Sequence, residues 1–263
     1  MKSIAIGMKV LRSLYLIINY KTFIVTFLAI ASTWICSYYK ILAEFPLTVI
    51  GIAIVFPVVF SIDSAYKRRE RALGLLADFK AHLLSIYYAS RDWLDEENND
   101  FQERVKNEVL EIYASLRVLF TADKASVVQA EKYIFDKISD LSVLVKEFRL
   151  YGLQSGEMSR ASQYVSKLAI SVENLKVILH YRTPVTLRAY SKIFIYSFPV
   201  LYAPYFASIA QQYSAGLDYM MPIMFSFILV SLDNIQGHLE NPFDQIGEDD
   251  IRFDVEDFAE MID

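Results

Sequence analysis

Four stretches of the chain contain no Asp, Glu, Lys or Arg, and charged residues separate them. They are residues 22–39, 45–62, 193–217 and 219–232. A helix needs about 20 apolar residues to cross the ~30 Å hydrocarbon core of a bilayer. The first three stretches are long enough when their flanks reach the interface. The fourth is short, and it spans only if Asp218 lies at the surface and the helix continues past Leu232. A buried core helix or a re-entrant segment is the alternative there.

The connections between these stretches predict two hairpins. Residues 40–44 leave room only for a tight turn, so the first two spans are expected to be antiparallel neighbours. Pro199 and Pro204 interrupt the third stretch, and each removes a backbone donor from the helix. We therefore expect the third span to be kinked.

The pattern between residues 63 and 188 is that of amphipathic helices. Apolar residues recur at intervals of three and four, which is the period of a helix with one buried face. Polar runs at residues 95–100, 121–125 and 152–157 separate the periodic segments. No strand-like alternation and no internal repeat are present. The pattern predicts an all-α bundle, with the helix of the second span continuing straight into it over residues 66–84. The periodic positions are Leu73, Leu76, Phe79, Leu83 and Leu84; Val105, Val109, Ile112, Leu116 and Leu119; Tyr133, Ile134, Ile138, Leu141, Val145 and Phe148; Leu168, Val172, Leu175 and Leu179.

Composition supports a membrane protein with a charged, water-facing middle. The chain has 263 residues, of which 54% are hydrophobic and 22% charged. That apolar content excludes disorder, and a single cysteine, Cys36, excludes a disulfide scaffold. Basic residues in short loops mark the cytoplasmic side of a membrane protein. Here every basic cluster falls on one side of the predicted spans, which predicts a multi-pass protein of the cell (plasma) membrane with both termini and the middle in the cytoplasm. These residues are Lys2, Lys9, Arg12 and Lys21; Lys67, Arg68, Arg69 and Arg71; Arg182, Arg188 and Lys192.

The tail carries most of the net charge. Residues 244–263 contain nine acidic residues and one basic residue, a net charge of −8, whereas the whole chain has −5. The other 243 residues are therefore about +3. A solvated acidic tail is the ordinary interpretation of such a run. A cation-binding loop is the alternative, because closely spaced carboxylates suit calcium, although the run does not match an EF-hand loop.

The sequence has no signature of enzyme chemistry or of nucleic-acid binding. It contains no glycine-rich phosphate loop, no nucleophile elbow and no His-Glu-x-x-His. His82, His180 and His238 are far apart, and none has a second ligand at metal-binding spacing. The basic residues are dispersed among acidic neighbours rather than gathered in a stripe. We therefore expect no enzymatic activity, no required cofactor and no nucleic-acid partner.

One apolar stripe lies on the second span. Ile52, Phe56 and Phe60 follow each other at intervals of four and share one side of a helix. Such a stripe ordinarily faces lipid or another helix. If several copies of the chain met around this face, the stripe would form stacked hydrophobic rings, which can gate a pore by dewetting.

Two segments carry a resemblance to a known family. Residues 45–74 resemble the second span of the bestrophin family of ion channels and its charged continuation. Phe60 matches the family's terminal Phe, and residues 64–66 match its Ser/Ala/Tyr trio. Residues 238–250 resemble the Asn-Pro-Phe-Gly-Glu-Asp signature that follows the family's last span. The layout of four spans with a long helical insertion after the second is also the family's.

The resemblance implies specific site residues. The family's hydrophobic neck maps onto Ile52, Phe56 and Phe60, and its second constriction onto Thr183, where an apolar residue is common. Animal members bind calcium after the last span. The corresponding residues are Asn241, Asp249 and Asp250, but residues 244–246 look inserted and Arg252 replaces an acid. The residues of the family's calcium site are therefore only partly matched in this chain, and bacterial relatives generally lack such a site.

These observations predict an all-α membrane protein whose four transmembrane helices per subunit are continuous with a cytosolic helical bundle. By resemblance, five subunits surround a central pore that conducts ions passively, anions such as chloride being favoured over monovalent cations. The partners are its own copies, membrane lipids and permeant ions. The predicted parts are residues 1–62, 63–188, 189–235 and 236–263: first hairpin, cytosolic helices, second hairpin and acidic tail. The alternative is a membrane-anchored interaction or scaffold protein.

Overall fold

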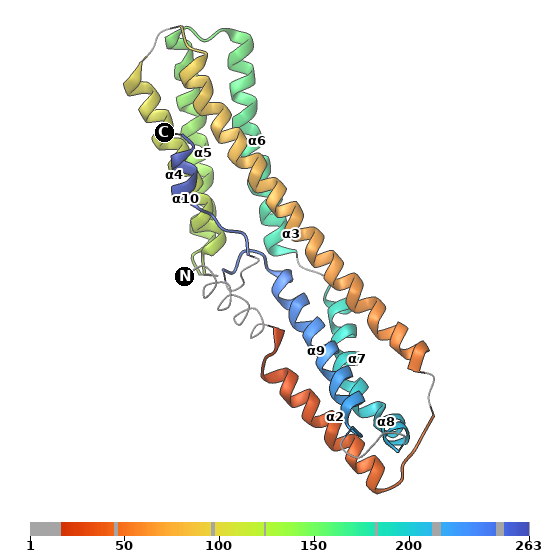
Figure 1. The fold of residues 1–263 in the computed structure, drawn as a ribbon. Coiled ribbons are helices and arrows are strands. Elements are labelled where there is room, and N and C mark those ends of the chain that lie inside the picture. The colour runs from red at the N-terminus through yellow and green to blue at the C-terminus, as the bar shows by residue number, and fades with distance from the viewer. Residues whose placement is uncertain are drawn as a thin grey trace. The chain divides into compact units, whose positions relative to one another are not determined.

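The computed structural model describes residues 17–44, 47–95, 98–123, 125–181, 184–211, 217–245 and 250–262 (Figure 1). Every regular element in these ranges is a helix, as the sequence predicts. In chain order they are α2 (Tyr20–Tyr38), α3 (Leu47–Asp92), α4 (Asn99–Thr121), α5 (Val127–Glu147), the 3-10 helix η1 (Phe148–Tyr151), α6 (Ser155–His180), α7 (Val185–Leu201), α8 (Ala203–Ala210), α9 (Met220–Glu240) and α10 (Val255–Glu260).

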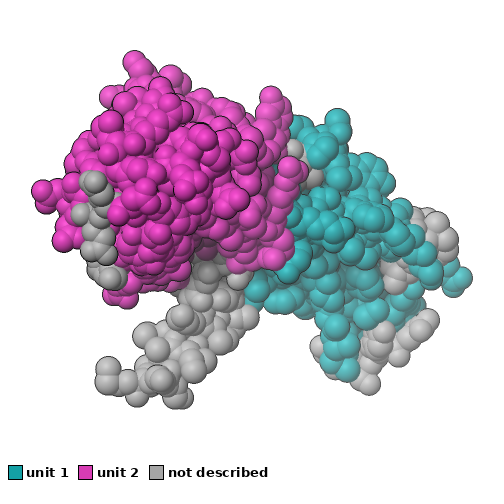
Figure 2. All heavy atoms as spheres, turned by 90° about the horizontal axis from the view of Figure 1, so that it is seen from above, with its two compact units in different colours: residues 1–68, 182–241, 247–249 teal, residues 69–181, 242–246, 250–263 magenta. Residues whose placement is uncertain are grey.

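The chain forms two compact units, which are coloured separately in Figure 2. Unit 1 comprises residues 1–68, 182–241 and 247–249, and unit 2 comprises residues 69–181, 242–246 and 250–263. α3 belongs to both, because its 46 residues run without a break from the second uncharged stretch into the charged middle. The predicted continuity of this helix is confirmed.

Unit 1 is built from α2, the start of α3, α7, α8 and α9. Its core is apolar and aromatic, and the helices meet through side chains that are almost fully buried. The core residues are Val25, Ile54, Val58, Ile195, Phe198, Tyr202, Phe206, Leu229 and Val230. The outward faces of α2 and α9 are also apolar: Phe23, Phe27 and Trp34 on α2 are 69%, 70% and 56% exposed. Helices that are apolar both inward and outward are typical of a membrane-embedded domain.

The third predicted span is broken rather than merely kinked. α7 already begins at Val185, directly after Pro184, and ends at Leu201. α8 follows after a bend of 41°. Pro204 lies in the first turn of α8, where its missing N–H is tolerated. Together with Pro199 inside α7, it explains why the chain restarts a helix instead of bending one.

The fourth predicted span does run on past Leu232, and α9 ends only at Glu240. Its last turns carry polar side chains that are buried by neighbouring segments. Tyr196 of α7 donates to Asp233 at 2.9 Å. The amide of Asn234 accepts from Asn19 at 2.9 Å and donates to the carbonyl of Ile17 at 2.7 Å.

An ion pair closes the same end of α9. Nη1 of Arg188 lies 3.1 Å and 3.0 Å from the two carboxylate oxygens of Glu240, which is 6% exposed. A buried carboxylate needs such a partner, because an uncompensated buried charge is strongly destabilising.

Among the described residues, α2 and α9 are long and apolar enough to cross a membrane, and the bent pair that ends in α8 can be counted as a third span. α3 adds the uncharged residues 47–62, with which this helix begins. The four-span arrangement therefore stays a prediction.

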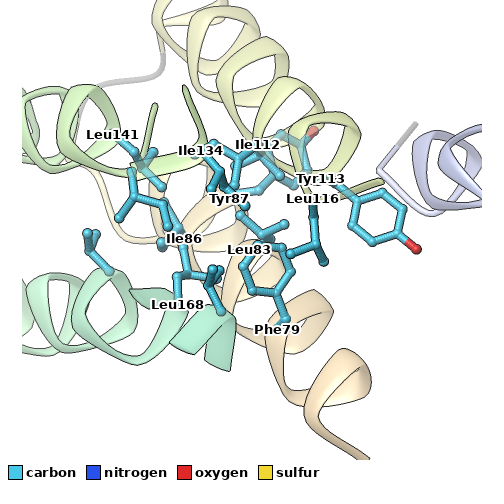
Figure 3. Packing of buried hydrophobic residues seen from close by; sticks show 14 of the residues in the cluster. Phe79, Leu83, Ile86, Tyr87, Ile112, Tyr113, Leu116, Ile134, Leu141 and Leu168 are labelled. Carbon is cyan, nitrogen blue, oxygen red and sulfur yellow. The ribbon is translucent and has the colours of Figure 1, made fainter. Parts of the chain in front are cut away.

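Unit 2 is a helical bundle around one hydrophobic core. The second part of α3 packs with α4, α5 and α6, and Figure 3 shows side chains from all four helices meeting in the centre. The positions predicted from the helical period on α4 are 0–1% exposed: Val105, Val109, Ile112, Leu116 and Leu119. The bundle predicted from periodicity is therefore confirmed over this helix.

The tail differs from the solvated segment that its charge suggests. Four of its apolar side chains, those of Ile251, Phe253, Phe258 and Ile262, are buried in the core of unit 2, and α10 packs on α4. Phe258 is 0% exposed, with its ring 4.6 Å from that of Tyr113. Phe253 stacks 5.7 Å from Phe120. The acidic residues Asp254, Glu256 and Asp257 stay exposed, so the segment is amphipathic rather than fully solvated.

Candidate functional site: the exposed face of helix α3

Helix α3 has two distinct faces within unit 1. Ile54 and Val58 are 2% and 0% exposed and belong to the core with α7, α8 and α9. Ile52, Phe56 and Phe60 are 52%, 56% and 56% exposed. Among the described residues, the predicted stripe therefore does not pack on another helix of the chain, which argues against one of the two ordinary interpretations.

The helical period explains this division. Successive residues turn by about 100° around the axis. Ile52, Phe56 and Phe60 then fall within an arc of about 80°. The buried residues Ile54 and Val58 lie on the opposite side. The rings of Phe56 and Phe60 are 5.7 Å apart and tilted by 45°, so they form one continuous aromatic ridge.

The same arc becomes charged directly after Phe60. Asp63 and Lys67 fall within the arc of the three apolar residues, about 4.5 Å and 10.5 Å further along the helix axis. Nζ of Lys67 donates to Oδ2 of Asp63 at 2.7 Å. The two side chains are 73% and 47% exposed, Lys67 more than Asp63. This pair is not among the site residues predicted from the sequence, although its spacing of four could have indicated it.

The remaining predicted site residues are Thr183, Asn241, Asp249 and Asp250. Thr183 and Asp249 lie outside the described residues. Asn241 follows the end of α9, and Asp250 lies in the loop that continues to Ile251. In the described part of the chain, no group of three or more His, Cys, Asp or Glu side chains could hold a metal ion. The calcium site stays a prediction.

A second candidate is a hollow of about 430 Å³ on unit 2, between α4 and α5. It is lined by Arg104, Asn107, Glu108, Glu111, Asp140, Val143, Leu144 and Glu147. Lys137 is paired with two of these acids, because its Nζ lies 3.0 Å from Glu111 and 3.8 Å from Glu108.

The titration of the two glutamates follows from these contacts. Burial raises the pKa of Glu108. Hydrogen bonds from Tyr133 and Lys137 lower the pKa of Glu111. These directions are what an ion-pair network between two packed helices produces, and they favour a structural role for the hollow.

Solved structures supply the comparison for the whole fold. No family model and no curated protein matches the chain. Structures of a bacterial bestrophin homologue from Klebsiella pneumoniae do match. A point mutant has 16% identity and a TM-score of 0.74, over 92% of this chain and 95% of that one. A second mutant gives 15% and 0.75 over the same shares. A third structure gives 15% and 0.72, over 92% and 94%. The chain therefore has the bestrophin fold.

Proposed function

We propose that this chain is a subunit of a homopentameric ion channel in which the exposed arc of α3 lines the pore. Ile52, Phe56 and Phe60 from each copy form three stacked apolar rings, the neck. The observation that carries the proposal is the exposure of this arc on a helix whose opposite side is buried. The bestrophin fold and the apolar outer surfaces of α2 and α9 support it.

The chemistry of such a neck is passive. Apolar rings do not replace the water that an ion loses, so a narrow ring excludes ions by dewetting and a wider one lets hydrated ions pass. No step needs a reacting group or a cofactor. The neck itself carries no charge and has no preference for the sign of the ion.

The remaining parts of the proposal come from the sequence. We expect a multi-pass protein of the plasma membrane, with both termini and unit 2 in the cytoplasm, because every basic cluster falls on one side of the predicted spans. Lipids cover the outer faces of α2 and α9. Permeation of monovalent anions such as chloride is favoured over that of monovalent cations.

A flux assay tests the neck. The purified protein is reconstituted in liposomes, and ion flux is measured for the wild type and for Phe56→Ala. Removing the ring widens the neck and lets water enter it, so flux should rise or the pore should stay open. Unchanged flux would remove Phe56 from the pore.

Phe27→Ala is the matched control. Phe27 is 70% exposed on α2, so the same truncation is made on an outward apolar face of unit 1 that the proposal assigns to lipid. Its flux should equal that of the wild type. A rise as large as that of Phe56→Ala would show that loss of any large apolar side chain makes the liposomes leaky.

Light scattering of the detergent-purified protein separates the channel from a membrane-anchored scaffold. A channel of this kind should contain about five copies of the 30.3 kDa chain. A monomer would contradict the central pore and favour the scaffold.

A further inference from the structure

We propose that Asp63 and Lys67 form a charge-compensated selectivity ring at the end of the neck. This proposal rests on the proposed function, because the ring exists only where copies of α3 surround a pore. It assigns control of the sign of the permeant ion to two residues that lie outside the apolar neck.

Position on the helix is the first argument. Asp63 is three residues and Lys67 seven residues beyond Phe60, which keeps both within the arc of Ile52, Phe56 and Phe60. Ser61 and Ala65, which follow on the opposite side, are 0% exposed. The surface that forms the neck therefore continues without a change of face into the charged pair.

Exposure is the second argument. An exposed acid and base one helical turn apart would be costly if this arc faced hydrocarbon, since charged side chains in membrane segments face water-filled cavities or protein. Their presence on the arc of the neck favours contact with water. An exposed ion pair of this kind is weak, so both charges remain available to a passing ion.

The order of the charges gives the expected behaviour. The Asp63 ring lies beside the neck, and the Lys67 ring lies one turn further. Rings of acidic residues favour cations and rings of basic residues favour anions. Because each subunit contributes one of each, the two rings largely cancel, and the wild type should discriminate only weakly. Because Lys67 is more exposed than Asp63, we expect the remaining preference to be for anions.

Single substitutions should reveal the effect of each ring on ion selectivity separately. Asp63→Asn leaves five lysines and should raise the chloride-to-potassium permeability ratio. Lys67→Gln leaves five aspartates and should lower it. Five unit charges about 8 Å from an ion in water act with opposite sign on chloride and potassium, so the ratio should change by at least about tenfold at low salt. The double variant should return close to the wild-type ratio.

The measurement is the reversal potential of reconstituted channels across a KCl gradient. Arg104 and Glu147 form a comparable exposed pair between α4 and α5, at 3.1 Å. Arg104→Gln and Glu147→Gln therefore change the same charges away from α3 and should leave the ratio unchanged. The effects of Asp63→Asn and Lys67→Gln should shrink in 1 M salt, where the Debye length is only about 3 Å.

The outcomes separate the two proposals. A conducting wild type whose ratio is unaffected by Asp63→Asn and Lys67→Gln, or shifted in one direction by both, would overturn the ring while leaving the channel intact. A wild type that conducts no ions would overturn the channel, and the ring with it. Opposite shifts that cancel in the double variant would support the ring.

Discussion

Replacing Phe258 by alanine should release the tail from unit 2. Phe258 is fully buried, and its ring lies 4.6 Å from that of Tyr113 on α4. A buried phenylalanine removes about 200 Å² of apolar surface from water, which at ~25 cal/mol per Å² corresponds to about 5 kcal/mol. Alanine retains only the Cβ, and measured costs of Phe→Ala in cores are about 3–5 kcal/mol.

That cost falls on a short segment at the end of the chain. α10 has six residues and is held by Phe258 together with Ile262, which is 3% exposed. A loss of about 4 kcal/mol weakens the docking equilibrium by roughly a thousandfold. The tail should therefore undock before the bundle unfolds.

Hydrogen exchange of the detergent-purified protein is the appropriate assay, since it resolves local opening. Amides of residues 255–262 should lose protection in Phe258→Ala, while those in the centre of α4 and α5 keep theirs. Met261→Ala is the matched control, because Met261 is in the same segment but 58% exposed. Unchanged exchange in Phe258→Ala, or equal loss in both variants, would refute docking through the Phe258 side chain.

Two further substitutions test local features by thermal unfolding. Gly152 has φ +89°, and a Cβ there would overlap the side chain of Asp95. Gly152→Ala should therefore cost about 1–3 kcal/mol and lower Tm by several degrees. Gly156→Ala, where a Cβ meets nothing within 4 Å, should leave Tm nearly unchanged; equal losses would contradict the strain at Gly152. Arg188→Met leaves the carboxylate of Glu240 buried without its partner and should cost about 3–5 kcal/mol. Adding Glu240→Gln should recover part of that loss, and no recovery would contradict the assignment of the cost to the unpaired charge.

The helical period was sufficient to predict the bundle. Val109, Leu116 and Leu168 are 0% exposed, because a regular helix repeats every 3.6 residues and side chains at that spacing meet the same core. The breaks between helices also follow from the sequence: α4 ends at Thr121 and α6 begins at Ser155, where polar runs interrupt the apolar pattern.

The tail could not be predicted in the same way. Phe253, Phe258 and Ile262 occur too irregularly to show a helical period, and a net charge of −8 suggests solvation. Their burial depends on side chains such as Tyr113 and Phe120 of α4, which lie far away in the chain. The polar residues of α9 present the same difficulty, since the partner of Glu240 lies 52 residues away in the chain, at Arg188.

For the candidate site, the spacing of the residues predicted the stripe, but it did not predict which other helices lie against it. Ile52, Phe56 and Phe60 share one side of a helix in any environment. Which side of α3 is left uncovered depends on where α7, α8 and α9 pack, and only the structure shows that Ile54 and Val58 take the covered side. The charged pair of Asp63 and Lys67 continues the same uncovered side of α3.

Cysteine accessibility tests the pore most directly. Cys36 is the only cysteine, so Cys36→Ser provides a cysteine-free background. In it, Phe56→Cys is compared with Ile54→Cys and Phe27→Cys while a water-soluble, charged thiol reagent is added to conducting channels. We expect modification to change the current through Phe56→Cys alone, since Ile54 is buried and the proposal assigns Phe27 to lipid. An unaffected Phe56→Cys, or an equal effect at Phe27→Cys, would contradict the assignment of this face of α3 to the pore.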